Sequence, residues 1–156
     1  MSTELLLQRA QMAHLEAMLD LRMALFAEGG ILTGQSGYAQ VRQANHAYFS
    51  RHLDDQNCVS WVVTAQDQVV ACGSLALFQR PPYPGNLHGR EAYLLNMMTL
   101  PAWRRRGAAR MVLQAALAEA RLRDCPRVWL HASEDGRSLY QEYGFIPVPA
   151  FMEATL

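Results

Sequence analysis

The sequence has no excess of charge of either sign. Lysine and arginine total 14, aspartate and glutamate also total 14, and the isoelectric point is about 7.0. Proteins that bind nucleic acid along their surface usually carry excess positive charge, so this composition speaks against such a protein. The 156 residues are 51% hydrophobic and 18% charged, as in ordinary folded domains. We therefore expect a single domain over residues 1–156.

Long apolar runs are also missing. No stretch approaches the roughly 18 to 20 apolar residues that a membrane-spanning helix needs. The N-terminal segment has only the three leucines 5–7 between Glu4 and Arg9. It thus lacks the basic start and long apolar centre of a secretion signal. We expect a soluble, cytoplasmic protein.

Cysteine is scarce, and its spacing is not that of metal ligands. The chain has three cysteines, an odd number. Cys58 and Cys72 lie in strand-like segments, and Cys125 precedes Pro126. We interpret all three as buried thiols of a protein in a reducing compartment, and we expect no metal site.

The spacing of apolar residues divides the chain into helices and strands. Helical spacing predicts four helices, over residues 12–28, 38–53, 107–123 and 134–143. In the third, the residues expected to face inward are Ala108, Met111, Val112, Ala115 and Leu122. Runs rich in β-branched and apolar residues predict strands over 58–65, 69–78, 92–100 and 127–132, with a final strand or strand pair from Phe145.

The order of these elements predicts an α/β (α+β) fold. The helix 107–123 joins the strands 92–100 and 127–132, and such a crossover makes the two strands parallel. The strands 58–65 and 69–78 are joined by only three residues, which predicts an antiparallel hairpin. We therefore expect a single mixed, mostly antiparallel sheet with helices on both faces.

The segment Arg104–Arg110, with the sequence RRRGAAR, begins a predicted helix directly after a predicted strand. The first amides of a helix have no partner within it and carry partial positive charge. Small residues at 107–109 allow a ligand to approach those amides, and three arginines add charge, so the segment is suited to a pyrophosphate. It lacks the Gly-Lys-Ser/Thr of a Walker-type loop and two of the three glycines of the dinucleotide fingerprint.

Two motifs resemble those of the GNAT superfamily of N-acyltransferases. TLPAWRRRGAA is similar to its acyl-CoA-binding motif, Arg/Gln-x-x-Gly-x-Gly/Ala after a strand and a proline, with Arg104, Gly107 and Ala109 at the defining positions. SLYQEYGF (138–145) is similar to the family's Leu-Tyr-x-x-x-Gly-Phe signature. The resemblance covers about residues 58–147.

The resemblance implies an acetyl-CoA co-substrate and no metal. The strand before the loop would splay from its parallel neighbour, and the acyl-CoA arm would lie in the opening, with the thioester near Met97, Met98 and Thr99. Ser133 stands where the family often has a cofactor-binding asparagine. The pyrophosphate would be held by the arginine-rich loop, through Arg104, Arg105, Arg106, Gly107, Ala108, Ala109 and Arg110.

The resemblance also implies an enzyme in which a primary amine attacks the thioester directly. Tyr140 stands at the position of the general acid that protonates the departing thiolate. Glu91 resembles the acidic residue that serves as base in some members, while His131 and an ordered water are the alternatives. Tyr140 also binds the cofactor in this scheme.

The acceptor is not specified by the sequence. It would lie among the first two helices, their loop and the loop 80–91, where Arg22, Glu28, Tyr83 and His88 are candidates. Peptide N-termini, lysines, polyamines, aminoglycosides and other small amines all remain open, as do longer acyl donors. The family frequently forms homodimers, and we expect one here. The alternatives to an enzyme are a non-catalytic acyl-CoA sensor and, less compatible with zero net charge, a nucleic-acid binder.

Overall fold

The computed structural model describes residues 3–32 and 37–156, so part of the loop between the first two helices, 33–36, lies outside the described residues. The strands are β1 (Leu6–Arg9), β2 (Cys58–Ala65), β3 (Gln68–Gln79), β4 (Arg90–Thr99) and β5 (Val128–Trp129). The helices are α1 (Leu15–Glu28), α2 (Tyr38–Arg51), α3 (Ala108–Leu122) and α4 (Glu134–Glu142), with short 3-10 turns at Met12–His14 and Pro101–Trp103.

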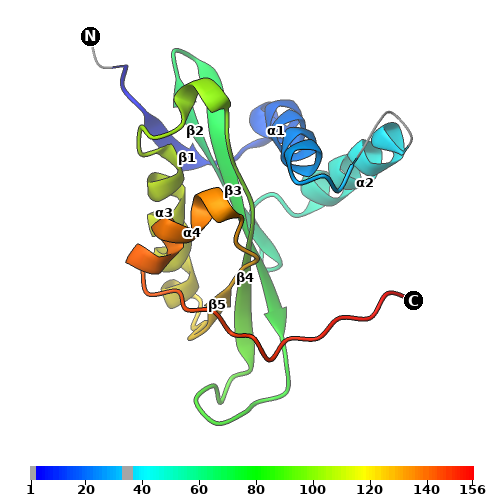
Figure 1. Ribbon diagram of the computed structural model, residues 1–156, viewed down its shortest axis with the longest axis vertical. Helices are drawn as coiled ribbons and strands as arrows, with labels where there is room; N and C mark the ends of the chain where they lie inside the picture. The colour runs from blue at the N-terminus through cyan, green and yellow to red at the C-terminus, as the bar shows by residue number, and fades with distance from the viewer. Residues whose placement is uncertain (1–2, 33–36) are drawn as a thin grey trace.

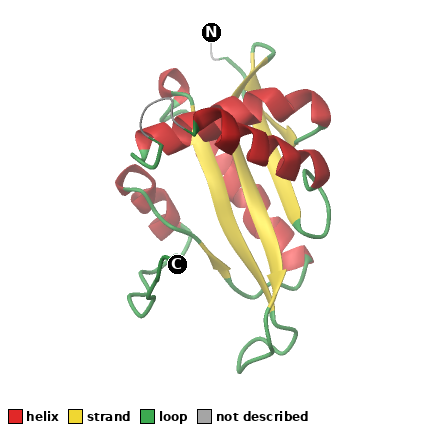
Figure 2. Ribbon diagram, turned by 90° about the vertical axis from the view of Figure 1, so that its right-hand side faces the viewer, coloured by secondary structure: helices red, strands yellow, loops and turns green. Residues whose placement is uncertain are grey.

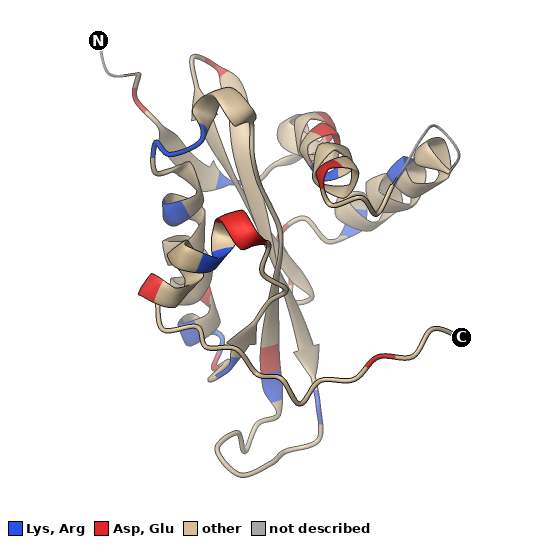
Figure 3. Cartoon of the chain, in the orientation of Figure 1, with Lys and Arg blue, Asp and Glu red and all other residues tan. Residues whose placement is uncertain are grey.

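The five strands form one sheet in the order β1-β2-β3-β4-β5, antiparallel except for the β4–β5 pair. Helices α1 and α2 cover one face of the sheet, and α3 and α4 lie on the other (Figures 1 and 2). This confirms the predicted fold class. Figure 3 shows that both acidic and basic residues lie on the helices of each face of the sheet.

Each face of the sheet has its own apolar core. The core under α3 contains Val59, Val63, Val70, Leu75, Val112 and Leu113. The core under α1 and α2 contains Leu15, Met18, Leu19, Phe49 and Val62. Successive residues of β2 supply opposite cores because side chains alternate along a strand. All three cysteines are buried, as predicted.

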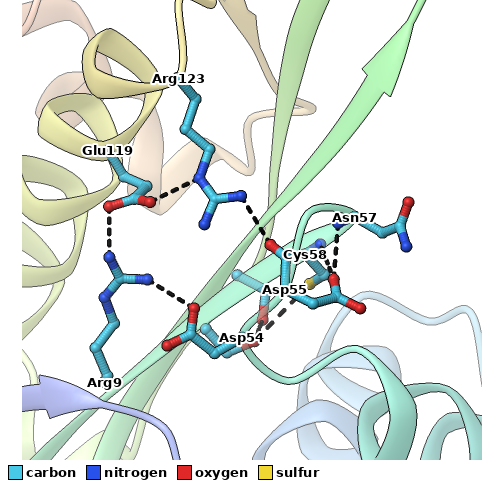
Figure 4. A network of polar contacts seen from close by, with 9 residues as sticks. Arg9, Asp54, Asp55, Asn57, Cys58, Glu119 and Arg123 are labelled. Carbon is cyan, nitrogen blue, oxygen red and sulfur yellow. Dashed lines mark hydrogen bonds and ion pairs between the residues drawn. The ribbon is translucent and has the colours of Figure 1, made fainter.

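A polar network joins α3 to the edge of the sheet (Figure 4). The carboxylate of Glu119, in α3, accepts hydrogen bonds from Arg9 at 2.5 Å and Arg123 at 2.7 Å. Arg9 also pairs with Asp54 at 2.9 Å, and Arg123 donates to the carbonyl of Asp55 at 2.8 Å. Glu119 is nearly buried, and two guanidinium partners satisfy its charge.

The structure differs from the sequence predictions at the edges of the sheet. The first strand, β1, was not predicted, because its side chains are alternately exposed and half-buried and give no apolar pattern. The strand predicted over 127–132 is shorter than expected and consists of Val128 and Trp129. The strand predicted from Phe145 does not form within the described residues 145–156, most of which are exposed. Leu122, expected to face inward, is 80% exposed at the last position of α3.

Candidate active site

Strands β4 and β5 diverge soon after they meet. They pair at only two positions, Ala92 with Val128 and Tyr93 with Trp129, whereas β4 continues beside β3 as far as Thr99. The edge of β4 that faces β5 therefore has no strand partner from Leu94 onward. Unpaired peptide groups on such an edge can bind an extended ligand. Met97, Met98 and Thr99, the residues expected near the thioester, lie in this part of β4.

Asn96 lies just beyond the point where β4 and β5 separate, and its side chain is not among the site residues predicted from the sequence. Its φ of 59° is left-handed, and the pairing of β3 with β4 shifts register here, between Cys72 and Ser74. The Asn96 side chain is only 3% exposed, yet neither its oxygen nor its nitrogen has a hydrogen-bond partner. Native proteins rarely leave a buried amide unpaired, because doing so costs free energy. The signal in the sequence was an asparagine in the middle of an apolar strand.

The arginine-rich loop lies at the end of β4 and forms the beginning of α3. Arg105 has a φ of 62°, and Gly107, which precedes the first residue of α3, has a φ of 94°. No side chain caps this helix end, and the first amide to bond within the helix is that of Met111, to the carbonyl of Gly107. The preceding amides, at 108–110, thus have no intrahelical acceptor. Unpaired amides of this kind can bind an anion, and the binding of a pyrophosphate by this loop stays a prediction.

The arginine side chains of this loop differ in their surroundings. Arg104 donates to both carboxylate oxygens of Glu28, at 2.7 and 2.8 Å, and to the carbonyl of Thr99 at 3.0 Å. It therefore ties the loop to the end of α1. Arg106 lies over the ring of Trp103 at 4.9 Å, and Arg105 is exposed. Arg110, at the start of α3, pairs with Glu142 at 2.7 Å.

Tyr140 lies in α4, and its side chain is 8% exposed. Its ring meets the ring of Phe145 edge-on at 5.8 Å, no group of the described chain bonds its hydroxyl, and burial raises its pKa. The hydroxyl of Ser133 accepts a hydrogen bond from the amide of Gly136 at 3.2 Å. Ser133 thus caps the helix that carries Tyr140.

Glu91 is fully buried at the start of β4 and is surrounded by cations. Both of its oxygens accept from Arg80 at 3.0 Å, and one also accepts from Tyr83 at 2.6 Å and from Arg127 at 3.3 Å. Burial raises the pKa of Glu91, but the bonds from Tyr83 and Arg80 and the charges of the two arginines outweigh it, so the pKa is lowered. Glu91 precedes the β4–β5 pairing and lies at its closed end.

His131 lies beyond β5, on the side where the strands separate. Its Nδ1 is 2.6 Å from the hydroxyl of Tyr93 in β4. The rings of Trp129 and Phe151 lie within 6.0 Å and 5.8 Å of the imidazole. His131 and Phe151 are exposed and the other two rings are half-buried, so this aromatic cluster is open to solvent at the divergence.

Two of the residues suggested to bind the amine acceptor lie away from the separated part of β4 and β5. Tyr83 belongs to the Glu91 cluster, and His88 is exposed in the loop between β3 and β4. A cavity of about 700 Å³ is lined by the end of α3, β5, α4 and the C-terminal segment, and includes Tyr140 and His131. None of the residues 104–110 lines it, so this cavity is separate from the arginine-rich loop.

Within residues 3–32 and 37–156, no group of three or more His, Cys, Asp or Glu side chains is arranged to hold a metal ion. No helix there has the length and apolar character needed to cross a membrane.

Comparisons with known proteins agree with this geometry. A structure of a predicted acetyltransferase with acetyl-CoA, from Clostridium acetobutylicum, is 26% identical, with 97% of this chain and 96% of that chain covered and a TM-score of 0.87. A GCN5-related N-acetyltransferase from Ralstonia eutropha is 25% identical, with 97% and 99% covered and a TM-score of 0.85.

A more distant likeness concerns the fold alone. An aminoglycoside N-acetyltransferase in complex with CoA is 16% identical, with 100% of this chain and 97% of that chain covered and a TM-score of 0.77.

A search of the curated proteins found no match. The family model described as the acetyltransferase (GNAT) family matches residues 16–145. The chain therefore belongs to the GNAT family of acetyltransferases.

Proposed function

We propose that the protein is an acetyl-CoA-dependent N-acetyltransferase that acetylates a primary amine. One observation carries the proposal: the unpaired edge of β4 leads directly into the uncapped start of α3. An extended thioester can bond the first and its pyrophosphate the second. The unpartnered amide of Asn96 lies in the same part of β4 and supports a ligand there. The likeness to a structure that contains acetyl-CoA supports the same donor.

In the proposed reaction, the nitrogen of the deprotonated amine attacks the carbonyl carbon of the thioester. The carbon–nitrogen bond forms, the carbon–sulfur bond breaks, and the sulfur leaves as a thiolate. The Tyr140 hydroxyl, which has no protein partner, gives its proton to that thiolate. A base or water takes the proton that the amine nitrogen loses, so proton and electron pairs balance.

The surroundings of the two candidate bases favour His131 over Glu91. The oxygens of Glu91 already accept from Arg80, Arg127 and Tyr83, and its lowered pKa makes it a weak proton acceptor. The imidazole of His131 is open to solvent at the divergence and has one hydrogen-bond partner, Tyr93. In this proposal Glu91 acts by holding the loop between β3 and β4.

The two bases are distinguished by matched variants. We expect His131→Ala to lower kcat/KM about 100-fold while the Kd for acetyl-CoA is unchanged. We expect Glu91→Gln to lower the melting temperature but to leave kcat/KM within about threefold of wild type. A large loss of kcat/KM in Glu91→Gln, with a normal value in His131→Ala, would restore Glu91 as the base.

The donor site is tested by calorimetric titration with acetyl-CoA. Ala109→Glu places a carboxylate at the start of α3, where it favours the helix but repels a pyrophosphate. We expect the Kd for acetyl-CoA to rise by on the order of 100-fold, with no loss of thermal stability. Ala118→Glu adds the same charge to an exposed position of the same helix, and there we expect an unchanged Kd. Equal Kd values in the two variants would contradict the pyrophosphate site.

The proposal extends to the setting of the enzyme. The three buried cysteines support a reducing, cytoplasmic location. Among the described residues, no strand pairs with the outer edge of β5. Ile146, Val148 and Phe151 of the C-terminal segment are 77%, 60% and 60% exposed. Exposed apolar residues beside an open sheet edge support a homodimer.

A further inference from the structure

Arg22, in α1, is a cation without an anionic partner. Its Nε–H donates to the side-chain oxygen of Asn45 in α2, and its guanidinium lies 4.6 Å from the ring centre of Phe26 and 5.8 Å from that of Phe49. Within residues 3–32 and 37–156, no acceptor bonds its two terminal amino groups. The side chain is half-buried, so its charge is only partly hydrated.

The groups around Arg22 do not neutralise it. Burial lowers the pKa of Arg22, which shows that its surroundings disfavour the charge. The titratable groups near enough to act on it have raised pKa values and are neutral at pH 7: Cys58, Cys72, Tyr48 and Tyr93. A half-buried guanidinium among neutral groups is ready to bind an anion.

Arg42, in the same pair of helices, shows the contrast. Its guanidinium bonds Glu16 at 2.9 Å and Asp20 at 3.0 Å across the α1–α2 contact. Arg22 has no acidic residue one turn away on α1, because residues 18, 19, 25 and 26 are all apolar. Of these two arginines, only Arg22 has its charge available to a ligand.

Arg22 lies near the part of β4 where the proposed reaction takes place. Helix α1 packs on β4, and Arg22 lies near enough to Tyr93 of that strand to interact with it electrostatically. The hydroxyl of Tyr93 in turn contacts His131. The thiol of Cys72, one of the neighbours of Arg22, donates to the carbonyl of Asn96, where β4 and β5 diverge. The guanidinium therefore lies on the α1 side of β4, where the acceptor is expected to bind.

We infer that the amine acceptor carries a carboxylate, and that Arg22 binds this carboxylate through its two free amino groups. The inference rests on the proposed acetyl transfer to an amine. A single guanidinium matches a single negative charge and presents two parallel N–H groups to two oxygens. A phosphate dianion would keep one negative charge uncompensated beside this single cation. The acceptor class is thus amino acids and peptides with a free C-terminus.

The test compares amines that differ only in the carboxylate: L-phenylalanine with phenethylamine, L-lysine with cadaverine, and a tripeptide with its C-terminal amide. We expect the wild type to favour the carboxylate member by at least about tenfold in kcat/KM in one or more pairs. Arg22→Met should lower kcat/KM for that member by about 100-fold, and for its neutral partner by less than about threefold. Arg42→Met is the control and should change neither.

A failure of the carboxylate inference can be distinguished from a failure of the proposed acetyl transfer. Because Arg22 also packs on two rings, Arg22→Lys tests the charge with less loss of packing, and we expect KM to rise about tenfold for carboxylates alone. Equal losses for both members of each pair, or a wild-type preference for the neutral members, would overturn the inference and leave acetyl transfer standing. A preference for O-phosphoethanolamine alone would overturn the choice of carboxylate. No transfer to any amine would overturn the proposed function and the inference with it.

Discussion

Replacing Tyr140 by phenylalanine is expected to lower kcat by about 100- to 1000-fold, the usual contribution of a general acid. Phenylalanine keeps the ring that packs on Phe145, and the hydroxyl has no partner in the described chain. The protein should therefore fold as the wild type does. The Kd for acetyl-CoA should stay within about twofold of the wild-type value. Steady-state kinetics and calorimetry on the same preparations measure both quantities.

The control is Tyr143→Phe, three residues further along. The hydroxyl of Tyr143 accepts from Gln114 at 2.8 Å and Arg110 at 3.3 Å, so it is already bonded within the protein. We expect kcat to change by less than about threefold. A Tyr140→Phe enzyme with normal kcat would remove Tyr140 from the mechanism. If the wild type binds acetyl-CoA but acetylates no amine, the protein is instead a non-catalytic acyl-CoA sensor.

The pH profile gives a second test of the same assignment. A general acid works only while protonated, and burial raises the pKa of Tyr140 above its ordinary 10.0. The alkaline limb that this hydroxyl causes should therefore lie above pH 10, and it should be missing from Tyr140→Phe.

Replacing Gly89 by alanine is expected to reduce the free energy of unfolding by at least about 3 kcal/mol. Gly89 has a φ of 68°, and a Cβ at this position would lie 1.9 Å from the carbonyl oxygen of Arg80. That oxygen belongs to the backbone, so it cannot move away by a simple side-chain rotation. The turn also brings Arg80 to Glu91, so its distortion disturbs a buried ion pair. Urea denaturation monitored by tryptophan fluorescence measures the loss.

Gly85 in the same loop is the matched control for Gly89. It has a φ of 90°, but no atom lies within 4 Å of a Cβ placed there. Gly85→Ala should therefore cost only the backbone strain, about 1 kcal/mol. Equal losses in the two variants would show that the contact with Arg80 is relieved by movement of the loop.

The sequence predicted the elements that have a buried face. Strand β2 was predicted with its observed bounds, 58–65, because nearly all of its side chains are buried and apolar. Helix α3 was predicted to within one residue at each end. Elements without such a face were missed or overextended: β1 has no buried residue, and β5 ends where its partner diverges.

The candidate site was predictable where chemistry is local in sequence. The loop at 104–110 and Tyr140 are recognised from residues a few positions apart. The groups that donate to Glu91 were not, because they come from two separate parts of the chain: Arg80 and Tyr83 from the loop between β3 and β4, and Arg127 from the segment before β5. Nor does the sequence show that Arg104 bonds Glu28, 76 residues away. Long-range ion pairs of this kind depend on the fold.

The burial of the three cysteines has a practical consequence for every kinetic test above. The reaction releases coenzyme A, whose free thiol a chromogenic disulfide reagent detects, but such a reagent reacts only with accessible thiolates. Burial raises the pKa of Cys72 to about 12 and also raises those of Cys58 and Cys125. The folded enzyme should therefore contribute almost no colour of its own, and product can be followed continuously at high enzyme concentration. Slow variants such as Tyr140→Phe then become measurable, and colour from the protein itself reports unfolding.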